Sequence, residues 1–422
     1  MNVLKLAAAI IIFLPVYAYA YLDPGTGNAL AAALFGLIGS VLFFSKNLYY
    51  KVKAKITGKE IKTNAANNLA FFSEGRRYWI FYKDIIDELI KRKVGFTYYT
   101  MDMDDPAFEI MDLGDSNADL DAFDIQYVGK GNKGYAAISA LKEPYLVTTT
   151  PNIGTPGYPI KKPKNCKNLI HIFHSISSVS IYHKHSLDSF DTAILSGKEF
   201  ERDIRALEKK RNLPPKKLLI GGLPYMDNLI AKASRLDIKT DGKTVLIAST
   251  WDKRGCLKTY GADFIKQIAQ AGYNVIVRPH PYSYVFEPDF IDKLAGQLKD
   301  FTNIKFDDEI DNLKSLARAD VLVSDVSAVR FDFLFAFDRP IISLETGYEN
   351  YDQYEYADLG YCWDVEIGKD LGAYVKKDEI GNIVEKIKGC INNKASIDKD
   401  SIVTNIGLSA EIIARQITDI ST

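Results

Sequence analysis

The sequence is poor in cysteine and in net charge, and it lacks the P-loop signature. Its four cysteines, Cys166, Cys256, Cys362 and Cys390, are far apart, and no CxxC or Cys/His cluster indicates a metal site or a disulfide framework. We expect them to be reduced core residues. The 53 basic residues balance 54 acidic ones, for a net charge of −1, so no global field points to nucleic acid. P-loop motifs and internal repeats are also missing.

What is present indicates a large folded protein. Apolar residues make up 47% of the sequence and aromatic residues 12%, which excludes a disordered chain. A length of 422 residues is sufficient for two α/β domains and additional segments.

The first 50 residues predict membrane insertion. Residues 1–20, with one early cation and an apolar run ending in Ala18-Tyr19-Ala20, resemble a signal peptide or a first transmembrane segment. Residues 29–50 form a second apolar run with a single charge, Lys46, long enough to span a bilayer. Five lysines follow between residues 51 and 62, so the positive-inside bias places the rest of the chain in the cytoplasm. The alternative is a buried helical hairpin of a soluble protein.

Two stretches of alternating strand and helix patterns follow. Residues 66–235 predict one Rossmann-like doubly wound domain, in which we expect residues 102–124 to form an acidic surface loop with one helical turn. Residues 242–395 predict a second domain with four or five βα units in a row, which requires a parallel nucleotide-type sheet. Residues 400–422 predict a C-terminal helix.

A polar turn after a buried strand is the strongest candidate for a phosphate site. The apolar run 320–326 ends in Ser324, Asp325 and Ser327, and a helical pattern begins at once. Hydroxyls, free N–H groups and the helix dipole favour an anion at such a turn, which lies at the carboxyl edge of a parallel sheet. Arg330 and Asp332 follow in the first helical turn, where Arg330 either faces phosphate or is exposed. The alternative for the turn is ordinary capping of the helix.

Two histidines also follow predicted strands. His280 lies in the sequence Arg278-Pro279-His280-Pro281, where it is suited to act as a general base, with Arg278 as a phosphate clamp. The alternative for His280 is a side chain that only caps a turn. His174 follows the strand predicted over residues 169–173 and precedes several serines that are able to meet phosphate or an acceptor. The alternative for His174 is a satisfied core histidine.

These motifs, in this order, resemble the CDP-glycerol glycerophosphotransferase family of teichoic-acid primases and polymerases. The resemblance runs over about residues 165–390 and includes Arg278–Pro281, Ser324–Asp332 and Arg339–Ile342. It departs from the family pattern at Ser175, where the family has Gly, and at Tyr225, where it has Arg. A third departure is the Arg after Thr250-Trp251, which is displaced to Arg254.

The resemblance implies a two-Rossmann GT-B-type enzyme and assigns roles to the motif residues. It implies that His174 and His280 are catalytic, and that the donor's phosphates and glycerol are bound by Ser324, Asp325, Ser327 and Asp332, with Arg278 and Arg330 nearby. It implies no metal and no cofactor. The partners that it implies are a CDP-linked polyol donor and a lipid-linked or glycan acceptor, at the cytoplasmic face of a bacterial inner membrane. Two further interpretations stay open: a sugar-nucleotide glycosyltransferase of the same fold, and a membrane-tethered binding protein with a decayed site.

Overall fold

A computed structural model describes residues 67–112, 123–239, 243–309, 311–347, 352–390 and 397–421. The two predicted membrane segments, 1–20 and 29–50, lie outside these residues. Within the described part of the chain, no helix is both long enough and apolar enough to span a bilayer.

The first domain is built on a parallel sheet. Its strand order is β3-β2-β1-β4-β5-β6-β7, and every pairing is parallel. The strands are β1 (Leu69–Ser73), β2 (Phe96–Thr100), β3 (Phe123–Tyr127), β4 (Tyr145–Thr148), β5 (Asn168–Ile172), β6 (Thr192–Leu195) and β7 (Lys217–Ile220). Strands β1 and β2 consist entirely of buried residues, as expected for strands covered on both faces.

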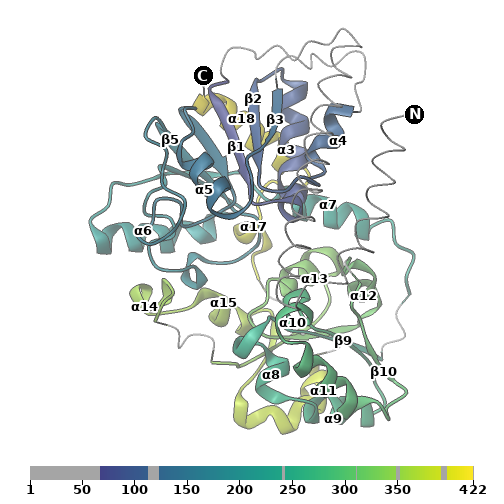
Figure 1. The fold of residues 1–422 in the computed structure, drawn as a ribbon. Helices are drawn as coiled ribbons and strands as arrows, with labels where there is room; N and C mark the ends of the chain where they lie inside the picture. The colour runs from purple at the N-terminus through teal and green to yellow at the C-terminus, as the bar shows by residue number, and fades with distance from the viewer. Residues whose placement is uncertain are drawn as a thin grey trace, which may run out of the picture. The chain divides into compact units, whose positions relative to one another are not determined.

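Helices cover this sheet. Those of the first domain are η1 (Arg76–Tyr78), α3 (Trp79–Lys91), α4 (Ala107–Asp112), α5 (Gly131–Ser139), η3 (Val179–Ile181), η4 (Lys198–Phe200), α6 (Glu201–Arg211) and α7 (Pro224–Ala233). The C-terminal helix α18 (Ser409–Ser421), yellow in Figure 1, returns to this domain and packs on α3. Ile413 and Ile417 of α18 lie in one hydrophobic cluster with Leu69 and Phe71 of β1, so burial of this apolar face holds the helix in place.

The second domain has its own parallel sheet, in the order β10-β9-β8-β11-β12-β13. Its strands are β8 (Thr244–Ala248), β9 (Asn274–Arg278), β10 (Ile304–Phe306), β11 (Val321–Ser324), β12 (Ile341–Leu344) and β13 (Gly372–Val375). Its helices are η5 (Asp252–Arg254), α8 (Cys256–Tyr260), α9 (Asp263–Gln270), α10 (Pro281–Phe286), α11 (Pro288–Leu298), α12 (Leu313–Arg318), α13 (Val329–Phe337), α14 (Tyr356–Leu359), α15 (Trp363–Glu366), η6 (Ile367–Lys369), η7 (Lys377–Asn382) and α16 (Ile383–Cys390); α17 (Lys399–Ile402) then leads to α18.

The expectation of two parallel α/β domains is therefore confirmed, with local corrections. The acidic stretch 102–124 does contain one short helix, α4, but its end belongs to the edge strand β3, which the charge-rich pattern concealed. Strand β11 is shorter than expected because the chain turns at Asp325.

Apolar contacts also join the two domains. One hydrophobic cluster includes Phe173 and Met226 of the first domain together with Phe331 and Trp363 of the second. Helices α7 and α13 pack against each other across this junction. The carboxyl ends of β5 and β7 are thereby held near the start of α13, so residues from both domains are able to contribute to one site.

Candidate active site

His280 follows β9 and stands at the start of α10. Its backbone is extended (φ −61°, ψ 142°), and its Nδ1 accepts a hydrogen bond of 3.1 Å from the backbone N–H of Tyr282. The Nδ1 atom therefore caps the start of α10, as in the capping alternative, whereas Nε2 takes no part in this cap. Because Nδ1 is an acceptor, the neutral imidazole carries its proton on Nε2 and is a hydrogen-bond donor there. Burial, together with the positive charges of Arg254 and Arg77, lowers the pKa of His280.

Arg278 is already paired inside the second domain. Its Nη1 lies 2.5 Å from a carboxylate oxygen of Asp307, and its Nη2 donates to the carbonyl of Glu309 at 2.7 Å. A direct contact with donor phosphates therefore stays a prediction, and it requires Arg278 to share or exchange these bonds.

The turn after β11 is organised by Asp325, which is buried. The carboxylate accepts hydrogen bonds from the backbone N–H groups of Thr250, Cys256 and Ser327 at 2.8–3.1 Å. It also accepts one from the Ser249 hydroxyl at 3.0 Å, and the hydroxyl of buried Ser324 donates to the carbonyl of Ala248.

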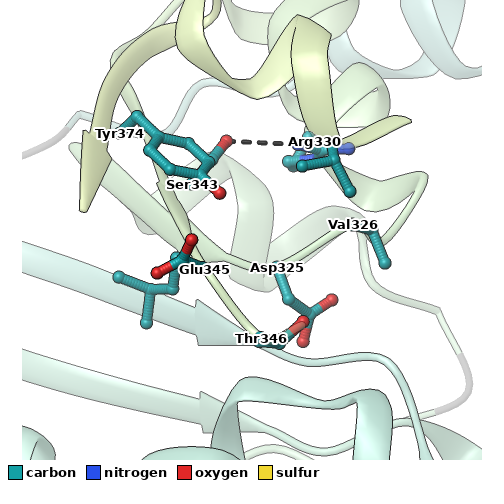
Figure 2. Close-up of a pocket in the computed structure, with 9 residues that line it drawn as sticks. Asp325, Val326, Arg330, Ser343, Glu345, Thr346 and Tyr374 are labelled. Atoms are coloured by element: carbon teal, nitrogen blue, oxygen red, sulfur yellow. Dashed lines mark hydrogen bonds between the residues drawn. The ribbon is translucent and has the colours of Figure 1, made fainter. Parts of the chain in front are cut away.

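These bonds correct the simple view of the turn as an open phosphate cradle. Ser324 and Asp325 hold the loop after β8 in place, whereas the half-buried Ser327 hydroxyl forms no hydrogen bond within the described residues. The cavity beside Asp325, shown in Figure 2, has a volume of about 10 Å³, room for about one water molecule and not for a phosphate.

Arg330 lies behind this turn and is 1% exposed. Its guanidinium donates to the carbonyls of Ser327 and Asp364 and to the Ser343 hydroxyl, the last bond being visible in Figure 2. The structure thus gives Arg330 internal partners, and a direct contact with a donor stays a prediction.

Asp332, two residues further along α13, faces the first domain. It accepts hydrogen bonds from the Tyr225 hydroxyl at 3.1 Å and from the Asn312 amide at 3.4 Å. Burial raises its pKa to about 6.

His174 follows β5 and lies in an aromatic environment. Its ring is 5.8 Å from that of Tyr78 and 5.3 Å from that of Phe81, measured between centroids. Its buried Nδ1 has no hydrogen-bond partner in the described residues. Burial lowers the pKa of His174 to about 4, so the imidazole is neutral at physiological pH.

A short segment of the first domain lies between the two histidines. The guanidinium of Arg77 is 5.2 Å above the ring of Tyr282, whose centroid is 5.2 Å from that of His280. The next residue, Tyr78, contacts His174. His174 therefore contacts Tyr78, and His280 contacts the Tyr282 ring on which the adjacent residue Arg77 rests, so the two histidines do not lie on opposite faces of the molecule.

This segment borders a pocket of about 530 Å³ that the sequence interpretation missed. Its lining includes Glu74, Arg76, Arg77, Tyr78, Asp102 and Tyr282. Most of these residues follow β1 and β2 at the carboxyl edge of the first sheet, where ligands bind in open α/β folds. The sequence does show polar residues directly after Ser73, and their place at the end of a predicted strand could have indicated this pocket.

Two parallel-sheet domains with polar groups at adjoining carboxyl edges define the GT-B-type architecture of nucleotide-dependent enzymes. Residues 175–366 match the family model of CDP-Glycerol:Poly(glycerophosphate) glycerophosphotransferases, which confirms the resemblance inferred from the motifs. The match covers 192 of the 422 residues, and it supports an enzyme of the CDP-glycerol glycerophosphotransferase type.

Solved structures give a similar picture of the fold. The chain is similar to the UDP-GlcNAc 2-epimerase of Methanocaldococcus jannaschii (17% identity, 83% of this chain and 99% of that chain covered, TM-score 0.53). It is also similar to the enzyme of the same name from Neisseria meningitidis (13% identity, 83% of this chain and 99% of that chain covered, TM-score 0.51). The wall teichoic acid polymerase TagF is similar as well (16% identity, 90% of this chain and 98% of that chain covered, TM-score 0.46). At these identities the likeness to the epimerases shows the fold alone. No curated protein matches the sequence.

Proposed function

We propose that this enzyme transfers glycerol phosphate, or a related polyol phosphate, from a CDP-linked donor to a hydroxyl of a lipid- or glycan-linked acceptor during synthesis of a cell-envelope polymer. The observation that carries the proposal is that one short segment links the two histidines: Tyr78 contacts His174, and Arg77 rests on Tyr282, which contacts His280. One imidazole comes from each domain, as a reaction between two substrates in the cleft requires.

His174 is the base in this proposal. Because its pKa is about 4, it is neutral at pH 7 and able to accept the proton of the acceptor hydroxyl without first losing one. Its Nδ1 has no partner among the described residues, so nothing in the described fold holds the ring in a single tautomer.

His280 is the donor of a hydrogen bond to the phosphoryl group. The bond from Tyr282 to Nδ1 keeps the proton on Nε2, where a phosphate oxygen is a suitable acceptor. Arg77 and Arg254 both lower the pKa of His280 through their charge, which places two cations near the same point. This local positive charge supports binding of the donor's two phosphates there.

The reaction is then an in-line displacement. The acceptor oxygen bonds to the β-phosphorus while the bond from that phosphorus to the bridging oxygen breaks. CMP leaves with the bridging oxygen and its electron pair, and His174 holds the acceptor's proton. His280 and the neighbouring arginines stabilise the charge that develops on the phosphoryl oxygens.

The membrane part of the proposal is supported by the sequence pattern of residues 29–62, which predicts an anchor with the catalytic domains in the cytoplasm. An anchor would keep the cleft close to a lipid-linked acceptor on the side where nucleotide donors are made. Fractionation of cells that express the full chain, with protease accessibility of a C-terminal tag, tests the anchor and its orientation.

A donor screen on the full-length chain tests the catalytic part. We expect CMP release from CDP-glycerol or CDP-ribitol and none of UDP from UDP-sugars. UDP release from UDP-glucose or UDP-GlcNAc instead would support the glycosyltransferase interpretation. Full synthesis of the polymer in cells by the His280→Ala variant would contradict catalysis and favour the binding protein.

A further inference from the structure

The pocket of about 530 Å³ beside the two histidines has a size typical of ligand sites and lies apart from the turn after β11. It is formed mainly by residues after β1 and β2, with Tyr282 contributed by the second domain. A ligand in it would touch Tyr78, whose ring also contacts His174.

The pocket offers one carboxylate with remaining hydrogen-bonding capacity. Glu74 is half-buried, and its Oε1 accepts a hydrogen bond of 3.2 Å from the Tyr158 hydroxyl. Burial raises the pKa of Glu74, while hydrogen bonds from Tyr158 and Tyr78 oppose that rise. A carboxylate has about four acceptor positions, so Glu74 is able to accept bonds from further hydroxyls.

The pocket also offers a positive charge that forms no ion pair with a carboxylate among the residues that the structure describes. The charge of Arg76 is neutralised by Asp102 at 2.7 Å and by Asp104 at 2.9 Å. Its neighbour Arg77 is exposed and rests on the ring of Tyr282, an arrangement that leaves guanidinium N–H groups available for an anion.

A carboxylate that accepts from hydroxyls and a guanidinium that pairs with an anion match a polyol that carries a phosphate. We infer that this pocket is the acceptor subsite, in which Glu74 binds the hydroxyls of a terminal polyol phosphate and Arg77 binds its phosphate group. The inference rests on the proposed transfer reaction for its role, but the binding itself is testable without that reaction. Tyr78 then positions the acceptor hydroxyl toward His174.

The test is a calorimetric titration of the full-length chain with glycerol 3-phosphate as the probe, in parallel with CMP as a probe of the donor site. The variants are Glu74→Gln and Arg77→Gln. The matched controls are Glu109→Gln and Arg235→Gln, which change exposed residues outside the pocket. We expect Arg77→Gln to weaken binding of glycerol 3-phosphate at least about tenfold, because a charge-assisted bond is lost. Glu74→Gln should weaken it several-fold, and Glu74→Gln and the two control variants should bind CMP like the wild type.

Equal affinity of all variants for glycerol 3-phosphate would overturn the inference, as would competition between glycerol 3-phosphate and CMP for one site. Failure of the proposed transfer reaction gives a different combination of binding and turnover results. If glycerol 3-phosphate binds in an Arg77-dependent way but CDP-glycerol is not turned over, the pocket assignment stands and the transfer reaction fails. If CDP-glycerol is turned over and the pocket variants keep the wild-type KM for the acceptor, the pocket assignment fails alone.

Discussion

The Tyr225 hydroxyl donates a hydrogen bond of 3.1 Å to Asp332, and this bond joins α7 of the first domain to α13 of the second. Tyr225 also contacts Phe81, whose ring lies against His174. The position at which the family has arginine is thus occupied by a neutral donor, next to a carboxyl group with a pKa of about 6. This interdomain contact near His174 consequently depends on pH.

Replacement of Asp332 by Asn should remove part of the pH dependence of stability. The folded-state pKa of about 6 exceeds the ordinary aspartate value, so the stability that this group contributes is complete below about pH 4 and is lost as the pH rises through 6. Asn still accepts from Tyr225 but does not ionise. Since Asp332 is half-buried, we expect a gain of about 1–2 kcal/mol at pH 8 over wild type and little gain at pH 4.

Urea unfolding at pH 4 and pH 8 measures this effect, with Asp300→Asn at an exposed position as the control. Parallel pH dependences of the wild type and Asp332→Asn would show that Asp332 does not titrate in this range.

His280→Asn should separate capping from catalysis. Asn is a favourable N-cap residue, so this variant keeps an acceptor for the Tyr282 N–H and should stay within about 0.5 kcal/mol of wild-type stability. His280→Ala loses the cap as well and should cost about 1 kcal/mol. Both should lower kcat about 100-fold or more, because neither donates from an imidazole nitrogen. Wild-type kcat in the Asn variant would reduce His280 to a capping residue.

Asp325→Ala should destabilise the second domain more than it perturbs donor recognition. The substitution leaves the backbone N–H groups of Thr250, Cys256 and Ser327 without their acceptor, at a cost of about 3–5 kcal/mol. Thermal unfolding of Asp325→Ala and Asp325→Asn checks this order, with Asn the milder change. Loss of CMP binding in Asp325→Asn at unchanged stability would instead mean that the carboxylate contacts the donor.

Substitutions of Arg278 and Asp307 should have non-additive effects on the free energy of unfolding, because the two side chains form one ion pair. Arg278→Gln leaves Asp307 without its ion pair, and Asp307→Asn leaves the guanidinium without its carboxylate, so the double variant should be no less stable than either single one. A double-mutant cycle by urea unfolding measures the coupling. An increase in the KM for the donor in Arg278→Lys alone, with no effect of Asp307→Asn, would support the phosphate clamp.

The strands of both sheets could be predicted because their buried apolar runs are continuous and end in turn residues. The edge strands β3 and β13 could not, since one follows an acidic stretch and the other contains glycine. The two histidines and the turn after β11 were visible as polar residues after strands. Their partners were not, because the N–H groups that bind Asp325 include those of Thr250 and Cys256, 75 and 69 residues away in sequence. The pocket at Glu74 also needs Tyr282 from the other domain, which no local pattern reveals.

The central claim is that His174 and His280 serve one transition state, and a double-mutant cycle on transfer tests it most directly. The measurement is the rate at which the full-length chain moves labelled glycerol phosphate from CDP-glycerol to an acceptor, for wild type, His174→Asn, His280→Asn and the double variant. We expect a large loss of rate for each single variant, and a double variant hardly slower than the slower of the two single variants. Wild-type rates in either single variant, or losses that multiply in the double variant, would contradict it.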